Sequence, residues 1–384
     1  MHQFKVCHIT TVHPVFDVRI FHKECVWLAN EGFDTYLIAR YSRDETIHGV
    51  HIIAIPEINV RGFGRVINAL HAFQKAICIR AYVYHFHDPE LLIVGLLLKC
   101  ITGSKIIYDV HEDVKLHGMG KSWRKGMIRI LIAYGLRGLE KLVIPFIDTA
   151  IIVVPSLLDF CHKRILVRNF PITSKSSMKR TVFTNTQRLT LIYIGVIRKK
   201  RGLFELLSTV KILKESYPSV LLQLVGPFIP PGLEDESRRF IHENNLRDHV
   251  DITGRVSFEE GQKRIENSDI GLCLIHHDPN SLNALPTKMF EYMLSGKPVV
   301  VSNYPLGESI VQETECGVVV DRLSPDTIAG AIIDIHKNPK RMKAMGENGR
   351  RAVLNQYNWE NEGKKLIACY YRLLSKSKND KYCF

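Results

Sequence analysis

The stretch LTLIYIGVIRKKRGLFELLSTVKILKE, residues 189–215, decides the fold class. It starts with an apolar, β-branched run that predicts a buried strand, Leu189–Ile194. Gly195 then allows a sharp turn, and Gly202 opens a segment with helical periodicity, Leu203–Glu215. A buried strand followed by a glycine loop and a helix is the repeating unit of an α/β fold with a parallel sheet.

The loop inside this stretch carries four consecutive cations, Arg198–Arg201. They lie between the carboxyl end of a strand and the amino end of a helix, where backbone N–H groups and the helix dipole favour an anion. Their side chains add charge-assisted hydrogen bonds to a phosphate or diphosphate. The alternative interpretation is a solvated basic loop without a ligand. The position at a strand edge favours the phosphate interpretation.

The same alternation of strands and helices runs along the whole chain, and a stretch rich in Ser, Thr and Lys, residues 171–187, separates two series of it. We therefore predict an α/β protein of two Rossmann-like domains that face each other across a deep cleft. Their predicted bounds are 1–168 and 188–358, with a linker at 169–187 and a C-terminal helix and tail at 359–384 that pack back towards the first domain. The predicted strands are Lys5–Ile9, Thr35–Ala39, Val50–Ile55, Val83–His87, Lys105–Asp109 and Thr149–Val154, then Leu189–Ile194, Val220–Val225, Val250–Ile252, Ile270–Leu274, Pro298–Val301 and Gly317–Val320.

Composition limits the classes of protein that fit. The chain has 384 residues with 46% hydrophobic and 24% charged residues, which suits two globular domains and excludes collagen, coiled coil and wholesale disorder. Its net charge of +13 favours an anionic partner. The nine cysteines are scattered without a C-x-x-C pair, which is typical of buried thiols in a reducing compartment. No stretch approaches the roughly 20 uncharged apolar residues that cross a membrane.

A second constellation is LPTKMFEYMLSGKPVVV, residues 285–301. Pro286 suits the first turn of a helix, and Gly296 suits its end. Glu291 falls in the middle of this helix, where a carboxylate near the cleft can accept hydrogen bonds from both hydroxyls of a ribose. The alternative interpretation is a surface glutamate that pairs with Lys288, one turn away.

This second constellation resembles the nucleotide-sugar motif of glycosyltransferase family 4, whose fold is the two-domain GT-B type. Other blocks resemble the same family in the same order. Gly195 to Gly202 corresponds to its G-x₅-K-G phosphate loop. The remaining blocks are TTVHPVFDVRIFHKE at 10–24, YHFHDPE at 84–90, YDVHED at 108–113, VRNFP at 167–171 and YNW at 357–359.

The resemblance implies retaining transfer of a sugar from a nucleoside-diphosphate sugar, without a bound metal or other cofactor. It makes Glu291 the ribose ligand and places Arg201, in the position of the family lysine, on the diphosphate. Arg198 would supply a second cation, because the residue directly after the glycine is Val196 instead of arginine. The further donor-binding residues it implies are Gly195, Pro286, Thr287 and Lys288.

The resemblance also assigns the acceptor side. His111 would reach the transferred sugar. The further acceptor-side residues are His13, Asp17, Arg19 and His87. Asn283 departs from the family pattern, because E-x₇-E places a glutamate eight positions before Glu291. Asn283 is retained as a catalytic candidate that can hydrogen-bond a sugar hydroxyl, and the change leaves room for an inactive homologue.

Other histidines carry weaker signals. His276, His277 and Asp278 follow a strand, and a polar loop is favoured over a metal site because no third ligand is apparent locally. His85 and His87 are expected on opposite faces of their strand, so that one of them is structural.

The segment Lys115–Arg129 mixes cations with Trp, Met, Leu and Ile, and predicts contact with an anionic membrane surface, against the alternative of an ordinary helix with a basic face. No nucleic-acid recognition motif is present, so nucleic acid is not an expected partner.

We expect a cytoplasmic glycosyltransferase, peripheral at the inner face of the membrane, that acts in surface polysaccharide or glycolipid synthesis. A UDP-sugar is the default donor, with a glycan or lipid-linked acceptor. The alternatives are a nucleotide-sugar epimerase of the same fold and a non-catalytic nucleotide-sugar-binding subunit.

Overall fold

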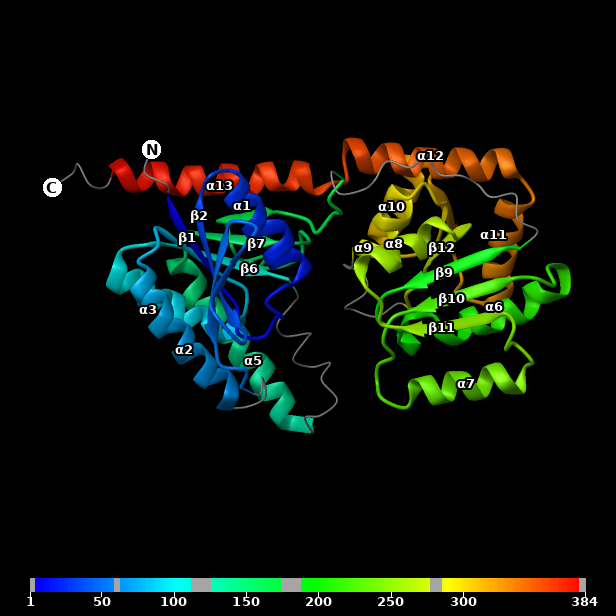
Figure 1. Ribbon diagram of the computed structural model, residues 1–384, viewed down its shortest axis with the longest axis horizontal. Coiled ribbons are helices and arrows are strands. Elements are labelled where there is room, and N and C mark those ends of the chain that lie inside the picture. Colours follow the sequence, from blue (N-terminus) through cyan, green and yellow to red (C-terminus); the bar gives the residue numbers. More distant parts are fainter. Residues whose placement is uncertain (1–3, 59–62, 112–125, 174–187, 277–284, 380–384) are drawn as a thin grey trace. The chain divides into compact units, whose positions relative to one another are not determined.

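The computed structural model describes residues 4–58, 63–111, 126–173, 188–276 and 285–379. The chain divides into two compact units: unit 1 comprises Met1–Asn169 and Trp359–Phe384, and unit 2 comprises Phe170–Asn358. Each unit is built around its own sheet, with helices packed on it (Figure 1). The α/β class predicted from the sequence is confirmed.

In its described part, unit 1 contains an eight-stranded sheet in the order β3-β4-β2-β1-β5-β6-β7-β8. Its strands pair in parallel except for β3 with β4. The chain leaves β1 towards β2 on one side and returns to β5 on the other, so the loop after β1 opens at a switch point of the sheet. The strands are β1 Lys5–Ile9, β2 Asp34–Arg40, β3 Glu45–Ile47, β4 Val50–Ile55, β5 Val83–Phe86, β6 Lys105–Val110, β7 Thr149–Ile152 and β8 Arg164–Leu166.

The helices of unit 1 include one of unusual pitch. The first, η1, is a π-helix at Val18–Cys25, and the Asp17 carboxylate caps its start by accepting from the N–H groups of Arg19 and Ile20. The last, α13, joins the unit from the far end of the sequence and is drawn in red in Figure 1. The elements are η1 Val18–Cys25, α1 Val26–Asn30, α2 Phe63–Ile79, η2 Pro89–Leu91, α3 Leu92–Thr102, α5 Gly126–Val143, η3 Ile144–Phe146 and α13 Trp359–Asn379.

In its described part, unit 2 contains a six-stranded parallel sheet in the order β11-β10-β9-β12-β13-β14. The chain moves outward from β9 to β11 and then returns to the other side of β9 with β12, so the switch point lies at β9. Ligands of open parallel sheets bind at such points, outside the carboxyl ends of the strands. The strands are β9 Thr190–Ile194, β10 Leu221–Val225, β11 Val250–Gly254, β12 Ile270–Cys273, β13 Val299–Ser302 and β14 Gly317–Val320.

Both faces of this sheet are covered by helices. Leu191 and Tyr193 belong to a buried cluster with α6 and α11, whereas Ile192 belongs to a second cluster with α9, α10 and α12. This alternation follows from the two-residue period of a strand. The elements are η4 Lys199–Arg201, α6 Leu203–Ser216, α7 Leu233–Glu243, α8 Phe258–Glu266, α9 Thr287–Leu294, α10 Pro305–Thr314, α11 Pro325–His336 and α12 Pro339–Asn355.

The structure differs from the sequence predictions in small elements. The short strands β3 and β8 were not predicted, because three residues carry too little periodicity. The basic loop contains a 3₁₀ turn, η4, directly before α6. The closing helix α13 occupies Trp359–Asn379 and so takes up most of the segment predicted as a helix and tail, 359–384. Among the described residues, no helix has both the length and the apolar character that a membrane span needs. The described cysteines are free thiols, and of these Cys78 and Cys100 are exposed.

Candidate active site

Two glycines meet at the carboxyl ends of neighbouring strands of unit 2. Gly195 follows β9 and Gly226 follows β10, with φ angles of +115° and +135°. The N–H of Gly195 donates to the carbonyl of Val225 at 2.8 Å. A β-carbon on Gly226 would collide with the carbonyl oxygen of Gly195. Glycine is therefore required at 226, because only it permits both the positive φ and this close backbone approach.

A pocket of about 210 Å³ opens beside this glycine contact. Its wall consists of the ends of β9 and β10, the loop after β11 and residues of α8 and α9. Apolar side chains form much of the wall, and a few polar groups point to the same space, as in small-molecule sites. The lining residues used below are Gly195, Gly226, Arg255, Ser257, Gln262 and Glu291. The structure thus brings together the predicted donor residues Gly195 and Glu291.

Glu291 reaches the pocket because the rest of its helix is anchored in the core. Met289, Phe290, Tyr292 and Met293 are fully buried, whereas Glu291 is half-buried at the pocket wall. The Tyr292 hydroxyl accepts a hydrogen bond from the backbone N–H of Ile194 at 3.0 Å. Helix α9 is therefore fixed to the end of β9, and the carboxylate of Glu291 is held beside the loop that follows this strand.

The four cations of the basic loop do not act alike. Lys199 is exposed and forms an ion pair with Glu236 of α7, with 2.6 Å between Nζ and Oε1. Arg198 is also exposed, whereas Arg201 is half-buried and packs near Tyr193. Burial raises the pKa of Tyr193, and the nearby Arg201 guanidinium only partly offsets this effect. Arg201 is therefore the cation of the loop that faces inward, next to the start of α6.

Lys288 lies under the Gly195 turn. Its side chain is buried, and Nζ lies 3.4 Å from the centre of the Tyr193 ring. A β-carbon built on Gly195 would be 3.6 Å from Lys288 Nζ, so the amine is the next group beneath this turn. The pKa of Lys288 is lowered to about 7, chiefly by burial and also by the Arg201 charge, while Cys273 and Glu291 act in the opposite direction. Lys288 is thus a cation that an anionic ligand would stabilise.

The remaining predicted donor residues lie around the start of α9. Pro286 is the residue directly before the helix and not in its first turn, and its carbonyl accepts from the N–H of Met289 at 3.2 Å. Thr287 is exposed at the first helical position. Asn283 falls outside the described residues, as do His277 and Asp278. His276 is described, and its Nε2 lies 2.9 Å from Oε1 of Glu205 on α6.

In unit 1, the loop after β1 is tied to the loop after β5. The Asp88 carboxylate accepts from the N–H of Thr11 at 2.6 Å and from the Thr10 hydroxyl at 2.9 Å. His13 lies beside it, with 3.6 Å between Nε2 and Oδ1 of Asp88, and its side chain is 31% exposed. Asp17 is 26% exposed and caps η1. These two acceptor-side candidates are accessible from solvent.

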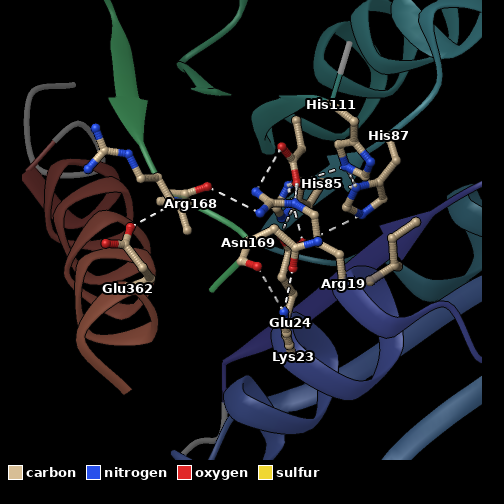
Figure 2. A network of polar contacts seen from close by, with 12 residues as sticks. Arg19, Lys23, Glu24, His85, His87, His111, Arg168, Asn169 and Glu362 are labelled. Atoms are coloured by element: carbon tan, nitrogen blue, oxygen red, sulfur yellow. Dashed lines mark hydrogen bonds and ion pairs between the residues drawn. The ribbon is translucent and has the colours of Figure 1, made fainter. Parts of the chain in front are cut away.

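Arg19 and His87 were predicted to border the acceptor, but both are buried in the interior of unit 1. Arg19 forms a bidentate pair with Asp109, with 2.9 Å from Nε to Oδ2 and 3.1 Å from Nη2 to Oδ1 (Figure 2). Burial alone would raise the pKa of Asp109, but Arg19 and His111 outweigh it and hold that pKa well below its ordinary value. The Arg19 guanidinium therefore positions this interior and does not face a ligand.

His111 is the partly exposed end of this network. Its side chain is 19% exposed, and Nε2 lies 3.2 Å from Asp109 Oδ2 and 3.4 Å from Nδ1 of His87. Burial lowers the pKa of His87 to about 4, so that ring is neutral at neutral pH. Asp109 consequently orients His111 towards the surface. Sequence reasoning quoted Asp109 in a motif but assigned it no role.

The expectation that His85 and His87 point to opposite faces of their strand is wrong. Residues two apart in a strand share a face, and the ring centroids of His85 and His87 are 4.7 Å apart. Both rings point into the same buried space, together with His8 of β1.

The family model of glycosyl transferases group 1 matches residues 174–352, which include the whole of the pocket wall. Residues 174–352 are a group 1 glycosyltransferase domain. The chain as a whole resembles solved structures over nearly its full length. A sucrose-phosphate synthase from Thermosynechococcus elongatus aligns with a TM-score of 0.73 and 17% identity, over 97% of this chain and 100% of that one. The predicted GT-B fold is confirmed.

Curated relatives carry transferase names. The chain is 22% identical to an MMP alpha-(1->4)-mannosyltransferase of Mycolicibacterium hassiacum, over 76% of this chain and 71% of that one. It is 26% identical to a GDP-mannose-dependent alpha-(1-6)-phosphatidylinositol monomannoside mannosyltransferase of Mycobacterium tuberculosis, over 47% of this chain and 46% of that one. Several of the alignments thus span only about half the length of the relative.

The structure also adds pocket residues that sequence reasoning missed. Arg255, Ser257 and Gln262 follow β11 and line the same pocket as Glu291. The general position of these residues was predictable, because any loop after a parallel strand opens at the same sheet edge as the Gly195 loop. Their role was not, because the composition of the loop after β11 does not distinguish it from an ordinary helix start.

Proposed function

We propose that this glycosyltransferase moves a sugar, with retention of configuration, from a nucleoside-diphosphate sugar to a glycan or lipid-linked acceptor in surface polysaccharide or glycolipid synthesis. The observation that carries the proposal is the pocket at the switch point of unit 2, where Gly195, Gly226 and Glu291 meet beside the basic turn. The two glycine turns leave room for a ligand close to the backbone, and the carboxylate of Glu291 suits the hydroxyls of a ribose. The nearby cations suit a diphosphate.

In this proposal Glu291 accepts hydrogen bonds from the two ribose hydroxyls. The base lies between the Gly226 turn and the loop after β11, where Arg255, Ser257 and Gln262 supply polar groups. The diphosphate then extends towards Arg201, Lys288 and the amino end of α6. In this arrangement the whole donor lies along one edge of the sheet, outside the carboxyl ends of its strands.

The chemistry of transfer follows from the leaving group. As the sugar departs, negative charge grows on the diphosphate, and fixed cations and helix N–H groups stabilise that charge. Arg201 and Lys288 are placed to supply this stabilisation. The positive charge beside the pocket of unit 2 comes from the side chains of Arg201 and Lys288. We therefore propose that the transfer step itself needs no added divalent ion.

His111 is the candidate for contact with the transferred sugar in unit 1. Asp109 orients its ring through Nε2, and the side chain is partly exposed, so we propose that the ring faces the ligand. His13 and Asp17 border the same surface as acceptor-side candidates.

A donor panel tests the function. Purified protein is incubated with UDP- and GDP-sugars, including GDP-mannose because a relative is named for it, and the products are separated by chromatography. Slow release of nucleoside diphosphate supports a transferase, and the preferred base identifies the donor. A new sugar isomer on intact nucleotide would instead make the protein an epimerase. Binding of a donor without any turnover would make it a non-catalytic nucleotide-sugar-binding subunit, and absence of both binding and turnover with every donor would overturn the proposed function.

We also propose a peripheral contact with an anionic membrane at the cytoplasmic face. The neighbouring helices α2 and α3 expose a group of large apolar side chains, which suits insertion between lipid headgroups. These side chains are Val66, Ile67, Leu70, Ile93, Leu97 and Ile101. The net charge of +13 supplies attraction to anionic lipid.

Flotation with vesicles tests this contact. The protein is expected to float with phosphatidylglycerol vesicles at low salt. With neutral phosphatidylcholine vesicles it is expected to stay in the bottom fraction of the gradient. Substituting Leu70 and Leu97 together by Ser tests the apolar group. Substituting Lys121, Arg124, Lys125 and Arg129, which carry the sequence prediction, tests the basic segment at about 1 kcal/mol per cation. Undiminished flotation of both variants would place the contact elsewhere.

A further inference from the structure

Four side chains of types that bind metal ions converge in the interior of unit 1, whereas the proposed donor pocket belongs to unit 2. Strands β1 and β5 are adjacent, with His8 opposite His85 in the register. His87 lies two residues further on the same face, and Glu24 points in from the π-helix η1 (Figure 2). All four side chains are fully shielded from solvent. Three imidazoles and one carboxylate are the donor set of a divalent transition-metal site.

Atoms of this cluster lack the partners that burial demands. Neither oxygen of Glu24 accepts a hydrogen bond within the described chain, and Nε2 of His85 has none either. Arg19 Nε lies 3.0 Å from Glu24 Oε1 but directs its hydrogen to Asp109. A buried carboxylate without a hydrogen bond is costly, so the pattern points to a group that the protein side chains do not supply.

The distances fit a cation at the centre. Glu24 Oε2 lies 3.7 Å from His8 Nδ1, 3.9 Å from His85 Nε2 and 3.8 Å from His87 Nε2. His8 Nδ1 and His87 Nε2 are 3.1 Å apart. Tetrahedral Zn²⁺ with bonds of about 2.0–2.1 Å places its ligand atoms about 3.4 Å from one another. These four separations lie within about half an ångström of that value, and all the ligand atoms of the cluster lie within 4.8 Å of one another.

The outer nitrogens of the three rings already have partners. The Tyr370 hydroxyl of α13 lies 3.0 Å from His8 Nε2 and 2.8 Å from His85 Nδ1. His87 Nδ1 lies 3.5 Å from Asp109 Oδ2. When an outer N–H donates to such an oxygen, the inner nitrogen presents its lone pair, which is the arrangement found around protein-bound metals.

We propose that His8, Glu24, His85 and His87 bind one divalent transition-metal ion, with Zn²⁺ as the ion to test first. The ion joins β1 and η1 to the end of β5, which comes much later in the sequence, and stabilises unit 1. With four protein ligands and no exposure, the site is structural and does not supply the transfer step. The competing account is a metal-free network in which the rings share protons, and the experiment decides between them.

Full-length protein is prepared without a histidine tag or metal resin, and its metal content is measured by mass spectrometry. The expected content is about one equivalent of Zn²⁺ per chain, or uptake of that amount after exposure to Zn²⁺. Co²⁺ in its place should give the visible absorption of a tetrahedral site. This measurement on the unmutated chain does not depend on any variant folding. Protein that neither contains nor takes up Zn²⁺, and shows no Co²⁺ bands, would overturn the proposal.

Variants locate the ion. Glu24→Gln is isosteric and should abolish retention of Zn²⁺ after dialysis. Tyr370→Phe keeps all four ligands but loses the outer hydroxyl, and should weaken Zn²⁺ binding about 10–100-fold. His162→Gln, at an exposed histidine of the same unit, is the matched control and should bind as the parent does. Zn²⁺ retained equally by the Glu24→Gln variant would place the ion elsewhere and overturn the assignment. The result is independent of donor turnover, because the readout is metal content.

Discussion

The ammonium nitrogen of Lys288 lies 3.4 Å from the centre of the Tyr193 ring, beneath the Gly195 turn. Burial holds the pKa of Lys288 at about 7, below the roughly 10.4 of an unfolded lysine. Between these values the unfolded chain binds more protons than the native one, so stability rises with pH from about 7 towards 10. The Tm of the unmutated protein should therefore rise between pH 7 and 9 relative to that of Lys288→Met. Parallel pH profiles of Tm would contradict this.

The same residue predicts how donor binding depends on protons. A diphosphate beside Lys288 favours its charged form, so donor binding at pH 8 should take up protons. Calorimetry in two buffers of different ionisation enthalpy measures this uptake. The uptake should be absent from Lys288→Met, whereas Lys343→Met, an exposed lysine of α12, should leave it unchanged.

Substitution of Glu291 should weaken donor binding. Glu291→Ala removes two charge-assisted hydrogen bonds to the ribose, which is worth roughly 2–3 kcal/mol of binding free energy. Glu291→Gln keeps one hydrogen-bond acceptor, so its donor affinity should lie between that of Glu291→Ala and that of the parent protein. Titration calorimetry with the preferred donor is the measurement, and the exposed Glu347→Ala is the control. Unchanged affinity in Glu291→Ala would end the ribose assignment.

Substitutions of Arg201 and Lys199 should have different effects on the kinetics of transfer. Arg201 faces inward and, in the proposed site, contacts the diphosphate on which charge grows in the transition state. Arg201→Ala should therefore lower kcat about 10²–10³-fold, more than it raises KM. Arg201→Lys should recover much of this loss. Lys199 is committed to Glu236 on the surface, so Lys199→Ala should change little. Equal damage from both alanine variants would mean that the loop acts as a diffuse patch of charge.

Transfer should proceed without added divalent ions. The cations near the pocket are side chains, so brief exposure to EDTA in the assay should leave the initial rate unchanged. A complete loss of rate that Mg²⁺ or Mn²⁺ restores would refute this prediction. A slow loss that only Zn²⁺ restores would instead concern the buried cluster of unit 1, so the two outcomes are distinguishable.

Gly226→Ala should damage the pocket and the stability of unit 2. The added methyl group collides with the Gly195 carbonyl, and alanine is strained at a φ of +135°. We expect a lower Tm and weaker donor binding, measured by calorimetry. Gly330→Ala is the matched control, because nothing lies within 4 Å of a β-carbon there and alanine favours a helix. A Gly226→Ala protein with the Tm of the parent would show that the turn relaxes.

The sequence by itself determined the fold class and the position of the basic loop at the edge of the second sheet. Strands such as Lys5–Ile9 and Gly317–Val320 were predicted with their observed bounds, because a strand buried on both faces is a local run of apolar, β-branched residues. Gly195 and Arg201 were predictable for a related reason: a glycine and cations directly after such a strand must lie at the carboxyl edge of a parallel sheet. The spacing of two residues was also enough to place His85 and His87 on one face of their strand. The prediction that they lie on opposite faces was wrong because it applied the two-residue period incorrectly.

Only the tertiary structure decided which groups meet and which are buried. Arg19 pairs with Asp109, ninety positions away, and the Tyr370 hydroxyl contacts His8 from the other end of the chain. No local period encodes such pairs, because β1, β5, β6 and α13 become neighbours through sheet order and packing. Burial then set the chemistry, since the same lysine or histidine is charged or neutral according to the water it loses. For that reason the sequence could name Arg19 and His87, but only the fold showed that they face the interior.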